Sequence, residues 1–247
     1  MIVKKVAKVI LTKLHLDLTN NIKYDRLTEM IMKIIIQKGS NCIDIGCHTG
    51  EILDNILKLA PEGQHFAFEP IPSLFASLQK KYAGKAAVFP FALANENGHT
   101  TFNFVRNAPA YSGIRQRKYA IGNPDIEVIQ VEKKKLDAVV SPEVQIDFIK
   151  IDVEGAEFEV LKGAQRILKD SKPTILFECG LGGSDFYGVK PQILYDFMVN
   201  EKHYNIYTLN DWLKKKAPLS LALFKENYDL NNEYYFIAQH KDKKNYC

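Results

Sequence analysis

The residues of this sequence best suited to chemistry are carboxylates and glycines that directly follow short apolar runs. The first run ends in residues 44–50, whose spacing is D-x-G-x-x-x-G, and the second ends at Glu69-Pro70. Later runs end at Ala92-Leu93, Asp152-Val153-Glu154-Gly155 and Glu178. If the runs are parallel strands, ligands bind beyond their carboxyl ends, so these five junctions form the candidate site. So many carboxylates suit a polar organic ligand with hydroxyl groups and a cationic centre, and would repel a polyphosphate.

Residues 44–50 have the composition of a turn that accepts a ligand carboxylate. Gly46 and Gly50 permit a tight turn and close approach of the backbone to a ligand. A helix that begins near Gly50 would direct its free N–H groups at a carboxylate such as that of a methionine moiety. Thr49 is a candidate ligand contact, and His48 could contact the ligand, act as a base or only complete the loop. Asp44 could orient the loop or receive the ligand ammonium group through water.

Glu69 favours an adenosine ligand over a purely structural turn. It lies 19 residues after Gly50 at the end of the second apolar run, where a carboxylate can accept hydrogen bonds from both ribose hydroxyls. NAD-binding proteins use the same device, so Glu69 indicates adenosine without choosing the cofactor. Pro70, Ala92 and Leu93 are expected to line the same pocket.

The most specific segment of the chain is residues 146–164, IDFIKIDVEGAEFEVLKGA. It resembles the hallmark of the FkbM-type methyltransferase family, a strand followed by an acidic turn and a helix. The resemblance covers about residues 40–180, and its other parts are Ile43 to Gly46, Phe68-Glu69-Pro70, Ala92-Leu93 with Asn97-Gly98, Leu136-Asp137 and residues 173–178.

This resemblance implies a class I methyltransferase sheet, S-adenosylmethionine as methyl donor and an O-methylated product. Sugars, polyketides and other secondary metabolites are among the substrates of the family. The chain departs from the commoner pattern at Cys47-His48-Thr49 and at Cys179-Gly180. These departures leave donor binding intact, but the acceptor is not specified.

Catalysis by this interpretation needs a group that accepts the proton of the acceptor hydroxyl, worth about 10²–10⁴-fold in rate. Asp152 and Glu154 are the first candidates, and Glu178 could share their cavity. Crowded carboxylates would raise one pKa and so give a base poised nearer neutrality. A Mg²⁺ ion held by Asp152 and Glu178 is a less favoured alternative, although hard oxygen ligands suit that ion. Glu154 could instead cap the helix that follows it.

The pattern of apolar residues predicts the scaffold that positions these groups. Strands are expected at residues 41–45, 64–68, 86–93, 146–151, 174–177, 204–209 and 234–239, the last two joined by an irregular segment. Helices are expected at residues 24–38, 51–59, 73–82 (with Ser73 as N-cap), 157–168 and 191–200. Such alternation indicates parallel βαβ units. The predicted fold class is α/β, a Rossmann-like, seven-stranded, mostly parallel sheet with helices on both faces and an antiparallel last strand.

Residues 1–38 are expected to form a helical extension packed on a single methyltransferase domain of residues 39–247. An insertion at about residues 99–131, two strands flanking a polar loop, is expected to roof the acceptor site. Residues 1–18 have the pattern of a basic amphipathic helix whose apolar run is too interrupted to span a bilayer. Docking on the domain is the main interpretation of this helix, and peripheral contact with an anionic membrane is the alternative.

The composition sets limits on the partners. A net charge of +4 over 247 residues is far from the concentrated basic excess of nucleic-acid-binding proteins, so a small-molecule or glycan acceptor is expected and no nucleic acid. Four cysteines without metal-ligand spacing favour reduced thiols and a cytoplasmic location. The rival functions are an NAD-dependent oxidoreductase, disfavoured by the missing G-x-G-x-x-G, and a catalytically silent adenosine-binding domain.

Overall fold

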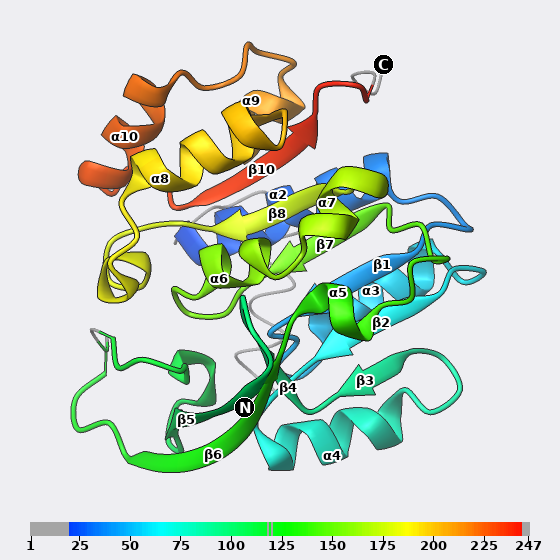
Figure 1. Cartoon of the computed structure of the whole chain (residues 1–247), viewed down its shortest axis with the longest axis vertical. Helices are drawn as coiled ribbons and strands as arrows, with labels where there is room; N and C mark the ends of the chain where they lie inside the picture. The colour runs from blue at the N-terminus through cyan, green and yellow to red at the C-terminus, as the bar shows by residue number, and fades with distance from the viewer. Residues whose placement is uncertain (1–19, 118, 120, 244–247) are drawn as a thin grey trace.

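The computed structural model describes residues 20–117, 119 and 121–243. A seven-stranded sheet of order β3-β2-β1-β7-β8-β10-β9 forms their centre, and a three-stranded sheet of order β4-β6-β5 lies beside it (Figure 1). In the large sheet β10 is antiparallel to both of its neighbours, and the other pairs are parallel. The predicted α/β fold class, with seven mostly parallel strands and an antiparallel last strand, is confirmed.

The strands of the large sheet are short and apolar, and they are almost wholly buried. They are β1 (Cys42–Ile45), β2 (His65–Phe68), β3 (Ala87–Phe89), β7 (Phe148–Ile151), β8 (Thr174–Glu178), β9 (Tyr204–Thr208) and β10 (Tyr235–His240). Every residue of β1, β2, β7 and β10 is buried. Continuous apolar runs of this kind are typical of strands covered by helices on both faces.

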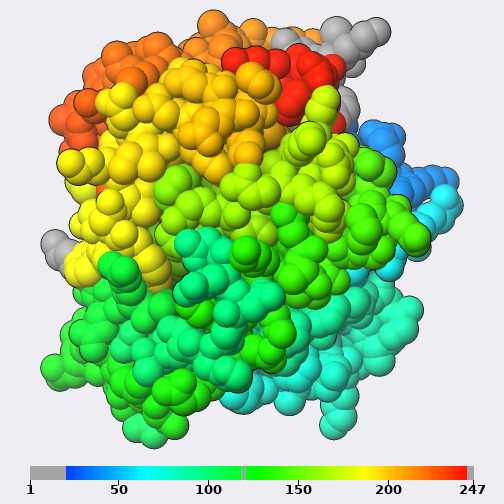
Figure 2. Space-filling view, in the orientation of Figure 1, coloured from blue at the N-terminus to red at the C-terminus, as the bar shows by residue number. Residues whose placement is uncertain are grey.

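Two layers of helices cover the sheet. The layer in front in Figure 1 consists of α5 (Leu136–Val139), α6 (Glu157–Lys162), α7 (Gln165–Asp170), α8 (Pro191–Tyr195), the π-helical turn η3 (Asp196–Glu201) and α10 (Leu221–Asp229). The layer behind consists of α2 (Asn20–Ile35), α3 (Glu51–Leu59) and α9 (Leu209–Leu213), and α4 (Pro72–Lys81) lies beside β3. In Figure 2 the side chains of the front layer, coloured yellow-green to orange, cover the middle of this face and hide β1.

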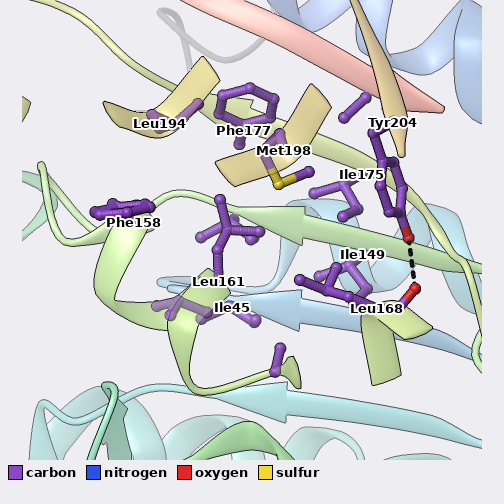
Figure 3. Close-up of a cluster of buried hydrophobic side chains, with 14 of the residues drawn as sticks. Ile45, Ile149, Phe158, Leu161, Leu168, Ile175, Phe177, Leu194, Met198 and Tyr204 are labelled. Carbon is purple, nitrogen blue, oxygen red and sulfur yellow. Dashed lines mark hydrogen bonds between the residues drawn. The ribbon is translucent and has the colours of Figure 1, made fainter. Parts of the chain in front are cut away.

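The front layer and the sheet share one hydrophobic core. Figure 3 shows that Ile45, Ile149 and Ile175 of adjacent strands face Leu161 of α6 and Met198 of η3. Full burial of each such side chain stabilises the fold by about 1.5–3 kcal/mol. This packing makes the carboxyl ends of β1, β7 and β8 a rigid platform.

The back face of the sheet is packed in the same way against α2. Phe148 of β7 and Leu176 of β8 belong to a cluster with Leu27, Ile31 and Ile35 of that helix. Residues 1–19, with the predicted basic amphipathic helix and half of the predicted extension, lie outside the described part of the chain. Among the helices that the structure describes, none combines the length and the apolar character needed to cross a bilayer.

Several predicted elements are divided in the structure. The run at residues 86–93 forms two strands, because Pro90 cannot donate a ladder hydrogen bond: β3 stays in the large sheet, and β4 (Phe91–Leu93) pairs with β6 of the small one. The helix expected at residues 157–168 is divided into α6 and α7 at Gly163, where an added Cβ would lie 2.1 Å from the carbonyl oxygen of Ala94.

Helix caps and the last connection also differ from the prediction. Ser73 is not an N-cap: α4 begins at Pro72 after Ile71, without a side-chain capping bond. The segment between β9 and β10, expected to be irregular, contains α9 and α10, which begin after Thr208 and Ser220. Both hydroxyl groups accept a backbone N–H of the first turn, as N-caps do. The position of Thr208 and Ser220 directly before apolar helical segments is the feature of the sequence that indicates these two helices.

The small sheet positions a long loop over the large one. β5 (Gly98–Val105) and β6 (Ile126–Lys134) pair antiparallel from Gly98↔Lys133 to Val105↔Ile126. Between them lies the insertion loop (residues 107–124), of which residues 118 and 120 are outside the description, and which contains the 3₁₀ turn η1 (Pro109–Tyr111). Gly113 returns to β5 through reciprocal hydrogen bonds with Asn103 of 2.8 and 3.2 Å.

Candidate active site

The predicted junctions meet at one edge, because β1, β2, β7 and β8 run parallel and end together (Figure 1). A narrow cleft with a cavity volume of about 60 Å³, here called the first cleft, opens there. Eight predicted site residues line it: Gly46, His48, Glu69, Pro70, Ala92, Leu93, Asp152 and Glu154. Asp44, Thr49, Gly50 and Glu178 do not belong to its lining.

The turn after β1 is tight because its glycines have no side chain. Gly46 has φ 76°, and an added Cβ would lie 1.9 Å from the carbonyl oxygen of Asp152. Gly50 has φ 81°, and there a Cβ would lie 2.2 Å from the hydroxyl of Tyr82. Both positions are in the left-handed region that favours glycine. The backbone of β1 therefore approaches the end of β7 closely and leaves a concave surface for a ligand.

Glu69 is held rigidly at the wall of the first cleft. One carboxylate oxygen accepts the backbone N–H of His48 at 2.9 Å, and the other accepts that of Ile71 at 3.0 Å. The side chain is only 4% exposed. Burial raises the pKa of Glu69 to about 7, although the two backbone hydrogen bonds oppose the shift. Each oxygen keeps a lone pair, so the carboxylate can accept two ligand hydroxyls at once.

The rest of the first cleft is largely apolar. Phe68, Ile71 and Phe91 contribute from the ends of β2 and β4, and Phe102 and Ile114 contribute from the insertion. A flat slot of this kind suits an aromatic base beside the hydroxyl-binding carboxylate of Glu69. The insertion thus supplies part of the wall of the first cleft.

A second cavity of about 590 Å³ meets the first cleft at Asp152 and Glu154, which line both. It lies behind the sheet edge, beneath the start of α2. Its wall carries polar, aromatic and charged groups, namely Asn21, Tyr24, Asp25, Thr28, Tyr111, Arg117, Lys150, Glu178, Asn231, Tyr234 and Tyr235. The shared carboxylates therefore stand between an apolar cleft and a polar cavity.

Asp152 is the most firmly placed of the predicted catalytic residues. Its Oδ2 accepts hydrogen bonds from the Lys150 ammonium group at 2.7 Å and from the Tyr235 hydroxyl at 2.9 Å. Burial opposes ionisation of Asp152, but Lys150 and Tyr235 outweigh it and hold the pKa of Asp152 below its ordinary value. Asp152 is consequently an ionised hydrogen-bond acceptor at neutral pH.

Glu178 and Glu154 differ from Asp152 in their surroundings. Burial, reinforced by the charges of Asp152 and Glu157, raises the pKa of Glu178 to about 8. Glu154 forms an ion pair with Arg117 of the insertion loop. It does not cap α6, which begins without a side-chain capping bond. Glu157, the first residue of α6, instead accepts the backbone N–H groups of Val153 and Gly155 in the preceding turn, at 3.0 and 3.2 Å. Glu178 is therefore the carboxyl group with the basicity that proton transfer near neutral pH requires.

Asp44 and His48 lie at the turn after β1 in different surroundings. Asp44 is fully buried next to Lys150, its cross-strand neighbour, and its carboxylate oxygens have no hydrogen-bond partner within the described residues. Burial raises the pKa of Asp44 to about 6, against the charge of Lys150. His48 faces the first cleft, and burial lowers its pKa. Thr49 is exposed at the outer side of the turn.

The Mg²⁺ alternative does not fit these residues. The ammonium group of Lys150 already bonds the Asp152 carboxylate, which would have to serve as a metal ligand. In the described ranges there is also no group of three His, Cys, Asp or Glu side chains arranged for a metal ion. The described cysteines, Cys42, Cys47 and Cys179, are buried and free.

Three site residues were missed in the sequence. Lys150 had a signal, because a lysine inside a buried apolar strand requires a carboxylate partner. Tyr235 stands in an apolar strand like any core aromatic residue, and Arg117 is one of several basic residues in a polar loop. For these two, only the fold shows that they reach Asp152 and Glu154.

The insertion loop is fastened to the sheet edge by two arginines. The guanidinium group of Arg117 lies 5.6 Å from the centre of the Tyr111 ring, in addition to its ion pair with Glu154. The guanidinium group of Arg115 lies 5.2 Å from the centre of the ring of Tyr187, which belongs to the 3₁₀ turn η2 (Ser184–Tyr187). The hydroxyl of Tyr187 accepts the backbone N–H of Arg115 at 3.1 Å. These contacts place the loop over the junction of the two cavities.

A buried carboxylate, a glycine turn and an acidic strand end thus meet at one edge of the α/β sheet. The chain matches the family described as methyltransferase FkbM domain over residues 44–208. It belongs to this family of S-adenosylmethionine-dependent methyltransferases. The NAD-dependent and silent alternatives are therefore not favoured.

Individual relatives are more distant. The chain is 27% identical over 168 residues to the 2-O-methyltransferase NoeI of Sinorhizobium fredii, covering 62% of this chain and 68% of NoeI. It is 24% identical over 166 residues to the AMB antimetabolite synthetase AmbE of Pseudomonas aeruginosa, of which it spans only 8%. Among solved structures, a methyltransferase FkbM from Methylobacillus flagellatus is 17% identical, with a TM-score of 0.49, covering 69% of this chain and 40% of that chain.

Proposed function

We propose that this protein transfers the methyl group of S-adenosylmethionine to a hydroxyl group of a sugar, a glycan or glycolipid, or a secondary metabolite. The observation that carries the proposal is the meeting of an apolar cleft and a polar cavity at Asp152 and Glu154. A donor in the first cleft and an acceptor in the second cavity would have their reactive atoms at this junction. The name of NoeI, a 2-O-methyltransferase, supports a hydroxyl acceptor.

The residues of the first cleft fit the donor. Glu69, fixed by two backbone N–H groups, would bind the ribose hydroxyls, and the apolar slot formed by Phe68 and Phe91 would hold the adenine. The turn at Gly46, which an added Cβ would fill, would admit the methionine moiety. When bound, the donor supplies an electrophilic methyl group: the C–S bond breaks with its electrons left on sulfur, and the C–O bond forms to the acceptor.

The residues of the second cavity would orient the acceptor and take its proton. Asp152, ionised and fixed through Oδ2, would accept a hydrogen bond from the acceptor hydroxyl and align it. The O–H proton would pass to Glu178, whose raised pKa makes it the stronger base when it is ionised. Tyr24, Tyr111, Tyr234 and Tyr235 line this cavity together with amide and carboxyl groups, a combination that suits a ring bearing several hydroxyls.

Calorimetry and turnover with the purified protein test the proposal. S-adenosylhomocysteine is expected to bind, and release of the same compound from S-adenosylmethionine is expected with at least one member of a panel of sugars, oligosaccharides and phenols. Glu69→Ala is the matched variant for the donor, and Glu178→Gln for the acceptor step. The proposal fails if neither donor nor product binds, and O-methylation fails if the methyl group is found on nitrogen or carbon.

A further inference from the structure

Lys150 is the basic residue of the acidic strand-turn segment that bonds the Asp152 carboxylate. It lies in β7 between the buried Ile149 and Ile151, and only 7% of it is exposed. Its ammonium group reaches the wall of the second cavity, not that of the first cleft. A lysine buried to this extent requires compensating negative charge.

Carboxylates from three adjacent strands provide that charge. The titratable groups that interact with Lys150 are Asp44 of β1, Asp152 after β7 and Glu178 of β8, with Cys47 and His48 of the turn after β1. Tyr235 of β10 and Arg117 of the insertion loop interact with Asp152. Burial opposes the charge of Lys150, but Asp152, Asp44 and Glu178 outweigh it and raise the pKa of Lys150. The lysine is therefore a permanent cation inside an acidic cluster.

The hydrogen-bond geometry shows what this cation does to Asp152. The Lys150 ammonium group and the Tyr235 hydroxyl both donate to Oδ2, at 2.7 and 2.9 Å. The carboxylate is thereby held in one orientation, and Oδ1 is left for a ligand at the junction of the two cavities. Fixed, charge-assisted contacts of this kind are the stronger class of hydrogen bond.

On the basis of the proposed methyl transfer, we propose that the Lys150 ammonium group takes the place of a divalent metal ion in this site. It balances the negative charges of Asp152, Asp44 and Glu178 and orients Asp152 toward the acceptor hydroxyl. Lys150 is a positioning residue, since it acts through Asp152. A Mg²⁺ ion at this place would use the same carboxylate oxygens, because it requires hard oxygen ligands. The lysine and the metal ion are thus mutually exclusive.

A metal-binding experiment tests this idea without any donor or acceptor. The electron paramagnetic resonance signal of free Mn²⁺ is followed as the metal is added to the wild-type protein and to Asp152→Asn. Wild type is expected to leave the signal unchanged, because the Lys150 ammonium group already bonds the Asp152 carboxylate. Wild-type protein that binds Mn²⁺, with the binding lost in Asp152→Asn, would overturn the proposal.

A kinetic experiment tests the positioning role. Lys150→Met is expected to lower kcat by about 100-fold and to leave the dissociation constant of S-adenosylhomocysteine within about threefold, because Lys150 does not line the first cleft. Lys150→Arg should restore part of kcat, and Lys172→Met, which removes a surface ion pair with Asp242, is the control. Unchanged kcat in Lys150→Met, or loss of wild-type activity with EDTA that Mg²⁺ restores, contradicts the role. Absence of binding or turnover in wild type instead refutes the proposed function and leaves the Mn²⁺ result standing.

Discussion

If Glu69 binds the ribose of the donor as proposed, donor binding is expected to depend on pH. Its carboxylate must be ionised to accept two ligand hydroxyls, and burial raises its pKa to about 7 in the empty cleft. Binding is therefore expected to be tight above pH 7 and to weaken as pH falls. If only the ionised form binds, the dissociation constant at pH 6 is about tenfold above its high-pH limit.

The Glu69→Gln variant gives the second half of this prediction. Each carboxylate oxygen accepts a backbone N–H, from His48 or from Ile71, so an amide places its NH₂ group against one of these donors. The unsatisfied pair is present with and without ligand, so it lowers the free energy of unfolding and not the affinity. Only the lost charge-assisted hydrogen bond, worth about 1.5–3 kcal/mol, weakens binding. We expect affinity for S-adenosylhomocysteine to fall by about 10- to 150-fold.

Isothermal titration calorimetry from pH 5.5 to 8.5 measures both effects. Wild type should show the pH-dependent loss, while Glu69→Gln should show a weak affinity that is nearly independent of pH above pH 6. Asp44, with a pKa raised to about 6, accounts for any dependence remaining below that point. Wild-type affinity that is constant between pH 6 and 8, or a variant with the same slope as wild type, would refute the assignment of Glu69 to the ribose.

Three further changes test the turn, the base and the loop. Gly46→Ala should lower the free energy of unfolding in urea by more than about 2 kcal/mol, because its Cβ would lie 1.9 Å from a backbone carbonyl oxygen. Gly84→Ala is the control, because Gly84 also has a positive φ, 72°, but nothing lies within 4 Å of its added Cβ. Equal losses of unfolding free energy in the two variants would contradict the steric reasoning. The kcat of wild type should rise with pH through about 8 as Glu178 loses its proton. Glu178→Gln should lower kcat by about 10²–10⁴-fold and remove this rise of kcat with pH. A pH profile of kcat that is unchanged in the variant would assign the base to another residue. Arg117→Met, which breaks the ion pair with Glu154, should raise KM for the acceptor more than the dissociation constant of S-adenosylhomocysteine, and the opposite ranking would place the loop at the donor.

The segments predicted best from the sequence are those whose conformation depends on neighbours close along the chain. The short apolar runs that alternate with helical segments indicate parallel strands, and the sheet has them. Pro90 shows the limit of local prediction. A proline is expected to interrupt the hydrogen bonds of a strand wherever it stands, but the pairing of Phe91 with the small sheet depends on β6, some forty residues away. Thr208 and Ser220, by contrast, cap α9 and α10 through hydrogen bonds that are local in the sequence.

The sequence by itself determined which residues end the strands, and therefore that Gly46, Glu69 and Asp152 come to one edge, because parallel neighbours end on the same side. Only the tertiary structure decided how their charges are shared. Ion pairing and burial depend on distances between segments remote in the chain, such as Arg117 with Glu154 and Tyr235 with Asp152. The sequence ranked Asp152 and Glu154 ahead of Glu178 as bases. In the structure Asp152 is bonded by Lys150 and Tyr235, Glu154 is paired with Arg117, and Glu178 has the raised pKa.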